Sequence, residues 1–473
     1  MAEKSIPTSI LIVGSGVFGL GTAYSLTQNP LFASTKITLL DRLPFPAADA
    51  ASVDTSRIVR ADYADIAYSS LAFEAQEKWR KEWWGQNGIY HEPGLAVICN
   101  SADEAGVGNG ELGREYMRKS MANVTALGLK PGKKSEGGEV EALESTDDIR
   151  RVCGKLAAGS GTTKEKKAHS AIGDFGYVNW RSGWADAEAG LVALLTKVEA
   201  TKRVTFLHGT VTRLHFSDDS VRGVEAQLAG QESTSKTLTA DLVFLATGAW
   251  TPALIDTRGV CSATGQVLTY MRITDAEESQ LAHNPTILNE SSGLFIIPPR
   301  KNLLKVARHG YGYANPTTIA HPERPGEEIT VSLPRTHIST PDLAVPTEGQ
   351  VACRKFVSEL FPSLAHRPFT HSRICWYTDT AKGDWLITYH PKYKNLFVAT
   401  GGSGHAYKYL PVIGDNVVQT ILGKTPELFR GKWEWPAVRG VEDQVWTEDW
   451  RGGRKGMVLD EELRAGLEVK SKL

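Results

Sequence analysis

The stretch SILIVGSGVFGLGTAYSLTQ, residues 9–28, places the glycine pattern G-x-G-x-x-G between an apolar run and a run with helical spacing. It predicts a buried strand over 10–13, a tight turn and a helix. In such a unit Gly14 permits the turn, Gly16 lets the backbone approach a pyrophosphate, and Gly19 lets the helix pack closely on the strand. The N-terminus of the helix then faces the phosphates of a dinucleotide.

Two further apolar runs extend this unit. The run KITLLD ends in Asp41, and a carboxylate at that strand end can bind a ribose hydroxyl of NAD or FAD. Much later, ADLVFLATGAW ends in small residues around Gly248, which allow a ligand to approach closely. A nucleotide layer that the chain re-enters after a long intervening segment favours a flavoprotein over a simple dehydrogenase. The alternative, a glycine-rich turn without a ligand, leaves this succession of strand, helix, strand and acid unexplained.

Composition excludes several classes of partner. The 473 residues carry 53 Lys and Arg against 54 Asp and Glu, a formal net charge of −1, without a basic stripe, so nucleic acid is not expected as a partner. No apolar run has membrane-spanning length. The chain is too long for one hydrophobic core, which predicts two domains. Five cysteines lie apart without a CxxC pair, which argues against a metal site or a disulfide scaffold: Cys99, Cys153, Cys261, Cys353 and Cys375.

Three motifs carry cationic or reactive side chains. RIVRADY, residues 57–63, sets Arg57 and Arg60 three positions apart in a stretch that is otherwise apolar or mildly polar. Charged side chains are seldom buried without a partner, so these arginines either face a ligand or extend to solvent at the start of a helix. RICWYTDT, residues 373–380, has the pattern of a strand. LFVATGGSGHAYKYLPVIGDNV, residues 396–417, predicts a strand, a glycine turn and a helix that offers backbone N–H groups to an electron-rich ligand edge.

In their order and spacing, GSGVFG, DTSRIVRADYAD, RICWYTDT and GGSGHAYKYLP resemble the sarcosine oxidase and fructosyl amino acid oxidase group of FAD-dependent amine oxidases. The L-pipecolate and L-saccharopine oxidases form the most similar branch, and the resemblance extends over about residues 8–425. It implies a covalently bound FAD, a small amine or amino acid as substrate, and O2 as the electron acceptor. Retention of the SRIVR sequence leans away from fructosyl substrates.

The resemblance also implies roles for individual residues. Cys375 takes the place of the cysteine whose sulfur bonds the flavin 8α-methyl carbon, although taken alone it would be a small buried strand residue. Arg57 takes the place of an arginine beside the flavin ring, and Arg60 and Lys408 take those of the substrate-carboxylate ligands. Taken alone, Lys408 would be a solvated helix lysine. The residues expected to bind the cofactor are Gly14, Gly16, Val17, Phe18, Gly19, Asp41, Ser56, Arg57, Val211, Gly248, Trp250, Cys375, Gly402, Gly404 and Lys408.

Elementary chemistry supports these roles. An α-amino acid brings a carboxylate into an apolar pocket, where Arg60 can hold it through paired, charge-assisted hydrogen bonds and Lys408 can add a second positive charge. Lys305 matches a lysine that contacts the flavin through water, and a cation there would stabilise negative charge as oxygen is reduced. Taken alone, Lys305 has the pattern of an edge-strand lysine. His309 matches a nearby active-site histidine, so Lys305, Arg57 and His309 are the candidate catalytic residues.

We therefore expect an α/β (α+β) fold with a Rossmann-like FAD-binding domain and a substrate domain built on a mostly antiparallel sheet. Alternating apolar strands from about Leu268 to Ala314 predict that second sheet. The FAD-binding domain is expected to be discontinuous, over 1–62, 172–258 and 366–430, with the substrate domain over 63–171 and 259–365 and a tail over 431–473.

The expected function is oxidation of a secondary amine to an imine, with O2 reduced to H2O2. The substrate would be an N-substituted or cyclic amino acid of the pipecolate, saccharopine or sarcosine type. Two alternatives within the class are an oxidase of N-methyl aromatic amino acids whose imine cyclises in a natural-product pathway, and a fructosyl amino acid oxidase. An NAD-linked dehydrogenase and a non-catalytic flavin-binding protein are alternatives from other classes.

The sequence also predicts where the protein resides and how it assembles. Ser471, Lys472 and Leu473 form SKL, which at a free C-terminus is a peroxisomal address read by an import receptor. A peroxisomal location suits an enzyme that releases peroxide. We expect a monomer that binds neither nucleic acid nor a membrane.

Overall fold

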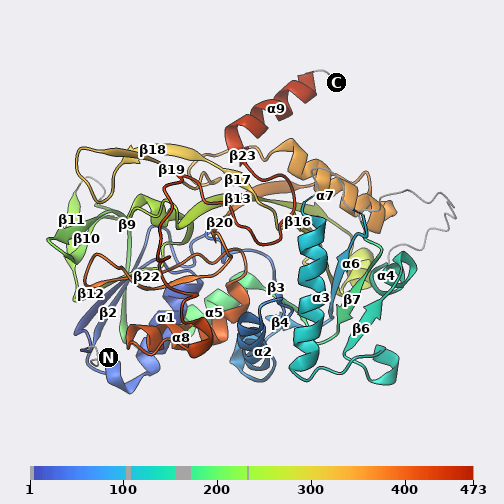
Figure 1. Ribbon diagram of the computed structural model, residues 1–473, viewed down its shortest axis with the longest axis horizontal. Helices are drawn as coiled ribbons and strands as arrows, with labels where there is room; N and C mark the ends of the chain where they lie inside the picture. Colours follow the sequence, from blue (N-terminus) through green and yellow to red (C-terminus); the bar gives the residue numbers. More distant parts are fainter. Residues whose placement is uncertain (1–4, 103–107, 155–171, 232–233, 472–473) are drawn as a thin grey trace.

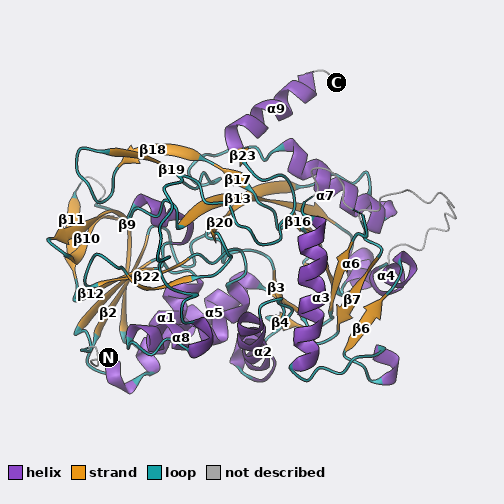
Figure 2. Ribbon diagram, viewed as in Figure 1, coloured by secondary structure: helices purple, strands orange, loops and turns teal. Residues whose placement is uncertain are grey.

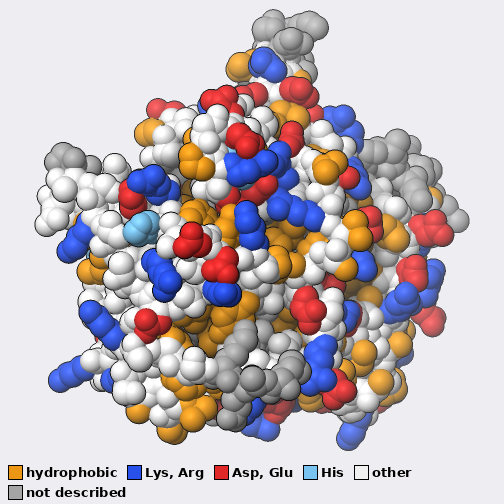
Figure 3. Space-filling view, turned by 60° about the vertical axis from the view of Figure 1, so that its left-hand side comes forward, with side chains coloured by type: hydrophobic (Ala, Val, Ile, Leu, Met, Phe, Trp, Pro, Cys, Tyr) orange, Lys and Arg blue, Asp and Glu red, His pale blue; other side chains and the backbone are white. Residues whose placement is uncertain are grey.

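The computed structural model describes residues 5–102, 108–154, 172–231 and 234–471. Two large β-sheets organise this part of the chain, and helices lie against them (Figure 1, Figure 2). The expected mixed α/β class, with one parallel-rich and one mostly antiparallel sheet, is confirmed. On the face shown in Figure 3, hydrophobic side chains line a hollow near the centre, and charged side chains of both signs lie around it.

The first sheet contains the unit predicted from the glycine pattern. Its strands are, in order across the sheet, β11 (Ser235–Thr239), β10 (Ser220–Leu228), β9 (Val204–Ser217), β2 (Lys36–Asp41), β1 (Ser9–Val13), β12 (Leu242–Leu245), β22 (Leu396–Thr400) and β21 (Leu386–Tyr389). The five central strands from β9 to β22 pair in parallel. Antiparallel pairs complete both edges.

Three helices cover one face of this sheet: α1 (Val17–Gln28), α5 (Ala187–Ala200) and α8 (Leu410–Ile421). Ile10 and Ile12 of β1 share a hydrophobic core with these helices. Leu11 and Val13 point the other way, into a second core with residues of β9 and β10. Burial of both faces explains the continuous apolar run of β1. The strand ends at Val13, so Gly14 lies at the C-terminal edge of the sheet.

The second sheet is mostly antiparallel. Its strands are, in order, β23 (Met457–Val458), β17 (Tyr313–Ala314), β13 (Cys261–Arg272), β16 (Leu303–Arg308), β15 (Leu294–Arg300), β14 (Thr286–Asn289), β5 (Leu95–Cys99), β7 (Phe175–Asn179) and β6 (Val140–Leu143). A further strand, β20 (His371–Thr380), pairs with β13 along its whole length. β14 pairs with β5 and β17 with β23 in parallel.

The two faces of the second sheet have different neighbours. One face packs on α7 (Thr347–Leu360). On the other face, Tyr270 and Cys375 enter the core that also contains residues of β1 and α1. Tyr270 lies opposite Lys305 and Gln266 lies opposite Cys375, and side chains four positions apart on β13 point to the same side. Lys305 and Cys375 therefore share the face that turns toward the first sheet.

Smaller elements complete the described fold. β3 (Arg57–Val59), β8 (Gly183–Ala185) and β4 (Tyr90–His91) form a three-stranded sheet, and β18 (Pro316–Ala320) pairs with β19 (Glu328–Ser332). The remaining helices are α2 (Ile66–Lys81), α3 (Gly110–Ala126), α4 (Thr146–Cys153), α6 (Asp275–Leu281) and α9 (Leu459–Ser471).

The predicted division into domains stays a prediction. β20 falls in a range expected for the FAD-binding domain, yet it pairs within the second sheet. The expected tail over 431–473 contributes β23 to that sheet and buries Trp450 and Arg451. α9 projects from the body of the molecule (Figure 1). Lys472 and Leu473 lie outside the described residues. Among the helices that the structure describes, none has both the length and the apolar character that a membrane span requires.

Candidate active site

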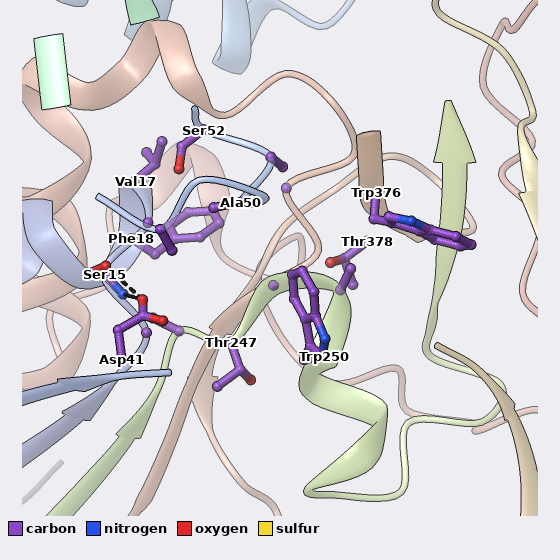
Figure 4. Close-up of a pocket in the computed structure, with 18 of the residues that line it drawn as sticks. Ser15, Val17, Phe18, Asp41, Ala50, Ser52, Thr247, Trp250, Trp376 and Thr378 are labelled. Carbon is purple, nitrogen blue, oxygen red and sulfur yellow. Dashed lines mark hydrogen bonds between the residues drawn. The ribbon is translucent and has the colours of Figure 1, made fainter. Parts of the chain in front are cut away.

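A cavity opens at the C-terminal edge of the first sheet, where β1 turns into α1 (Figure 4). Gly14 has a φ of +101°, and a Cβ there would lie 2.4 Å from the Ala246 carbonyl oxygen. A Cβ at Gly19 would lie 1.8 Å from the Gly14 carbonyl oxygen, so close packing of helix and turn requires glycine at both positions. A Cβ at Gly16 would meet only Ser52 Oγ, at 3.6 Å. Gly16 is therefore free of protein contacts on the side where a ligand would pass.

Asp41 lies at the end of β2 on the wall of this cavity (Figure 4). One carboxylate oxygen of Asp41 accepts hydrogen bonds from the Ser15 amide at 2.7 Å and the Ser15 hydroxyl at 2.6 Å. The other accepts from the Arg42 amide at 2.7 Å. These bonds fix the carboxylate beside the glycine turn, where it can accept from a ribose hydroxyl. Predicted cofactor residues that line the cavity are Gly14, Gly16, Val17, Phe18, Asp41, Arg57, Val211, Gly248, Trp250, Gly402 and Gly404.

The cavity fits a dinucleotide cofactor. At one end the backbone N–H groups at the start of α1 meet the glycine turn, which is the arrangement that binds a pyrophosphate. Trp250 and Trp376 also line the cavity (Figure 4), as do Tyr377 and His405, so it extends from the first sheet to strand β20 of the second. Within the described part of the chain, no group of His, Cys, Asp and Glu is arranged to hold a metal ion.

A cluster of buried charges lies behind this end of the cavity, centred on Asp54. Lys305 Nζ donates to Asp54 Oδ2 at 2.5 Å and to the Ser56 carbonyl at 2.8 Å. Arg57 donates to the same carboxylate, and Arg373 lies 3.7 Å from it. Burial alone would raise the pKa of Asp54, but these three cations together hold it well below its usual value. Asp54 is thus an ionised carboxylate that balances part of a concentrated positive charge.

Lys305 is the most enclosed cation of this group, since only 2% of its surface is exposed. Burial lowers its pKa to about 7, against the opposing effect of Asp54 and with the help of Arg57. Its place on β16, with the side chain directed toward the first sheet, excludes the edge-strand alternative. Lys305 and Ser56 do not line the cavity themselves; Arg57 lies between them and the cavity wall.

Cys375 lies beside the same cluster. Its side chain is 1% exposed, and Arg57 Nη2 lies 3.6 Å from the sulfur. Cys375 is not among the residues that line the cavity, although its neighbours Trp376 and Tyr377 are. The sulfur is therefore next to a guanidinium whose residue does line the cavity.

Arg60 and Lys408 form a second buried cationic group. Lys408 Nζ lies 2.6 Å from the Tyr63 hydroxyl and 2.8 Å from the His405 carbonyl. The Arg60 guanidinium stacks 4.9 Å from the centre of the Tyr63 ring. Burial and the charge of Arg60 lower the pKa of Lys408 well below its usual value. Within the described residues no carboxylate pairs with Lys408. The alternative in which these cations extend to solvent is wrong, because Arg60 is 6% and Lys408 5% exposed.

His309 lies close to this cationic group. Its ring centre is 5.1 Å from the Trp450 ring and 5.7 Å from the Tyr377 ring. Burial and the charges of Arg451 and Arg60 lower the pKa of His309 well below its usual value, so the imidazole is neutral. His309 thus lies beside Arg60 and Lys408, although the three residues come from segments far apart in the sequence: the one that follows β3, the one that follows β16, and the turn before α8.

Several residues of this region were missed from the sequence. Asp54, Tyr63, Tyr377 and His405 lie inside the quoted motifs, but none of them was given a role. His405 lines the cavity, and its Nδ1 lies 3.3 Å from the Tyr63 hydroxyl. Trp450 belongs to no motif. The sequence could not reveal it, because its position near His309 depends on how the segment before β23 packs against the sheet.

A dinucleotide cavity that leads to buried cations on a second sheet defines a nucleotide-dependent oxidoreductase fold. Residues 9–420 match the family described as FAD dependent oxidoreductase, and the chain belongs to that family. The chain is 34% identical over 458 residues to amino acid oxidase imqH of Aspergillus flavus, covering 88% of this chain and 93% of that protein. It is 30% identical over 434 residues to L-saccharopine oxidase of Schizosaccharomyces pombe, covering 90% and 93%.

Solved structures give the same result. A modified fructosyl peptide oxidase from Aspergillus nidulans superposes with a TM-score of 0.77 at 26% identity, covering 94% of this chain and 97% of that one. The predicted resemblance to this group of FAD-dependent oxidases is confirmed. FAD is therefore the dinucleotide that the cavity accommodates, and the alternative of an NAD-linked dehydrogenase is wrong.

Proposed function

We propose that this protein is an FAD-dependent oxidase of α-amino acids whose amine is secondary, either N-substituted or part of a ring. The observation that carries the proposal is the buried pair of Arg60 and Lys408, of which Lys408 has no carboxylate partner among the described residues. A substrate carboxylate would supply the negative charge that stabilises the protonated form of Lys408, which burial and Arg60 otherwise disfavour. The amino acid oxidase and L-saccharopine oxidase relatives support a substrate of this class.

The overall reaction removes two electrons and two protons from the C–N bond to give an imine, and O2 takes up both to give H2O2. Bound FAD supplies the redox chemistry by carrying the two electrons from substrate to oxygen. Arg60 and Lys408 bind and orient the carboxylate. Lys305, held by Asp54, would in its protonated form stabilise the negative charge that develops as oxygen is reduced. His309 packs against Trp450 beside the carboxylate-binding pair, and burial keeps its imidazole neutral.

A substrate screen tests the proposal. Purified protein is mixed with pipecolate, saccharopine, sarcosine, N-methyl aromatic amino acids and fructosyl amino acids, and peroxide release is measured. We expect rapid release with at least one secondary α-amino acid. The absence of peroxide with every secondary α-amino acid would contradict the proposed substrate class.

The carboxylate role is tested with the best substrate and its primary amide. Because the amide lacks the negative charge, we expect wild-type kcat/KM to fall about a hundredfold from acid to amide. Arg60→Ala should abolish this preference by lowering kcat/KM for the acid alone. Arg213→Ala is the matched control, since Arg213 is an exposed arginine paired with Glu225. An acid-to-amide ratio unchanged by Arg60→Ala would contradict the role.

We further propose that the Cys375 sulfur bonds the 8α-methyl carbon of FAD. The support is the place of Cys375 beside Arg57, a residue that lines the FAD cavity. After acid precipitation, the yellow colour should stay in the pellet for wild type and pass to the supernatant for Cys375→Ser. Cys353→Ser, which changes a buried cysteine of α7, should behave as wild type. Release of colour from the wild-type protein would exclude the bond.

One observation favours a second candidate, an oxidase of N-methyl aromatic amino acids. The cationic pair lies among aromatic rings: Arg60 lies over Tyr63 and Tyr116, and Tyr116 contacts Trp450 at 5.4 Å between ring centres. Such rings suit an aromatic side chain. In the same screen this candidate predicts a higher kcat/KM for N-methylphenylalanine than for sarcosine.

Peroxisomal location through Ser471, Lys472 and Leu473 is also part of the proposal. A fusion with a fluorescent protein at the N-terminus should co-localise with a peroxisomal marker. Removal of Leu473 should disperse the signal, and an unchanged pattern would contradict the address.

A further inference from the structure

Glu290 is a buried carboxyl group that the proposed reaction does not use. It directly follows β14, and its backbone N–H donates to the Ile98 carbonyl of β5 at 2.9 Å. Its side chain is completely buried. Oε1 lies 3.5 Å from Arg60 Nη1, and Oε2 has no hydrogen-bond partner among the described residues. A buried carboxyl oxygen without a partner is costly, so its position needs an explanation.

The charged and titratable neighbours of Glu290 come from several elements. Arg60 is the cation that acts on it, while Asp62 and Asp449 are carboxylates that oppose its ionisation. Asp62 is itself satisfied by hydrogen bonds from Tyr177 and Asn179. The remaining titratable neighbours are Tyr116 of α3, Tyr177 of β7 and Cys99 of β5, and Arg114 and Arg118 of α3 act on Cys99. Burial raises the pKa of Glu290 to about 8.

Arg60 therefore has two possible anionic partners. In the free protein its Nη1 donates to the Asp62 carbonyl and lies near Glu290, whereas the proposed function gives it the substrate carboxylate. Two ionised carboxylates that share one buried guanidinium repel each other. This repulsion disappears when one of them takes up a proton. Glu290 is the member that can do so, because a substrate α-carboxylate is a much stronger acid.

We propose that Glu290 is a positioning residue that must be neutral when Arg60 binds the substrate carboxylate, so that binding takes up a proton whenever the free protein holds Glu290 ionised. This inference rests on the proposed carboxylate role of Arg60. When Glu290 is neutral, the Arg60 guanidinium can pair with the substrate carboxylate alone. The protonated carboxyl group of Glu290 can then donate a hydrogen bond through Oε2. Carboxylate binding should accordingly weaken as the pH rises above about 8, by up to tenfold per pH unit.

Calorimetric titration with benzoate, a carboxylate that has no oxidisable C–N bond, tests the coupling. The flavin-containing protein is titrated at pH 9 in two buffers of different ionisation enthalpy, which gives the number of protons taken up on binding. We expect Glu290→Gln to take up about one proton fewer than wild type. Its benzoate Kd should also lose the wild-type rise between pH 8 and pH 9.5.

Lys408 could take up a proton in the same experiment, so the comparison is repeated in a Lys408→Met background. There, too, Glu290→Gln should remove about one proton of uptake. Proton uptake that Glu290→Gln leaves unchanged in both backgrounds would overturn the inference and assign the proton elsewhere. If the wild-type protein binds benzoate without taking up any proton, that result alone overturns the inference. Failure of wild type to bind benzoate, together with an acid-to-amide ratio of about one, would instead remove the carboxylate role of Arg60 and this inference with it.

Discussion

The nucleotide end of the site is built from main chain, whereas the end at the second sheet is built from buried charge. At the first end, Gly14 and Gly19 bring the backbone of the β1–α1 turn so close that a single Cβ would collide with a carbonyl oxygen. At the second end, Lys305, Arg57 and Arg373 surround one carboxylate, Asp54. Adding a side chain to a glycine should therefore disrupt the nucleotide end, whereas removing a charged group should destabilise the end at the second sheet.

The largest effect is therefore expected at Asp54. Asp54→Asn keeps the size of the side chain but leaves three cations without their carboxylate, and loss of one partner from a buried charge pair costs about 3–5 kcal/mol. The free energy of unfolding in urea should fall by that amount. Asp219→Asn is the matched control, because Asp219 and its partner Lys394 are more than half exposed, and its effect should stay below about 1 kcal/mol. Equal losses for the two variants would mean that the Asp54 cluster is no more sensitive than the surface.

The nucleotide end was predictable because its requirements are local. The spacing of Gly14, Gly16 and Gly19 and the acid at Asp41 lie within one β–α–β segment, where backbone geometry links sequence position to spatial position. The same argument found both sheets, since apolar runs and alternation mark their strands. Local patterns could not assign β20 to its sheet. The pattern of RICWYTDT predicts a strand, but its pairing with β13 depends on contacts between residues that are far apart in the sequence.

The glycine turn should respond differently at two neighbouring positions. Gly14→Ala forces a left-handed backbone and a collision with Ala246, so we expect a loss of about 1–3 kcal/mol in stability. Gly16→Ala meets only Ser52 Oγ at 3.6 Å, so thermal stability of the flavin-free protein should hardly change. Its added methyl group nevertheless occupies the path of a pyrophosphate, and the flavin-to-protein absorbance ratio should drop severalfold. Normal flavin content in Gly16→Ala would show that the cofactor does not pass this glycine.

The charged end was only partly predictable. Arg57 and Arg60 were found because cations in an apolar stretch are conspicuous, whereas Lys305 and Lys408 were found only through the family resemblance. Their partners were not, since Tyr63 and Asp54 carry no signal that tells which distant cation they contact. Glu290 lay outside every motif: a single glutamate at a strand end is ordinary in sequence, and only the fold reveals that it is buried beside Arg60.

The last expected effect, the smallest for each half-unit step of pH, separates two buried carboxyl groups whose pKa values shift in opposite directions. Cations lower the pKa of Asp54, so its contribution to stability is present above about pH 4 and is lost only as the pH falls through its folded-state pKa. Burial raises the pKa of Glu290 to about 8, so between about pH 4.5 and pH 8 the folded state holds a proton that the unfolded state has released. Stability should therefore decrease as the pH rises through this window, by about 1 kcal/mol per pH unit at most.

Glu290→Gln should flatten this decrease, because the amide does not titrate. The measurement is the free energy of unfolding in urea at half-unit steps from pH 5 to pH 8.5, for wild type and the variant in parallel. Glu225→Gln is a suitable control, since Glu225 pairs with exposed Arg213 and its own pKa is lowered rather than raised. The test needs neither substrate nor cofactor turnover, so it examines the buried carboxyl group by itself. If wild type and Glu290→Gln give parallel curves, Glu290 is ionised in the folded protein, and Arg60 is then already neutralised before any substrate arrives.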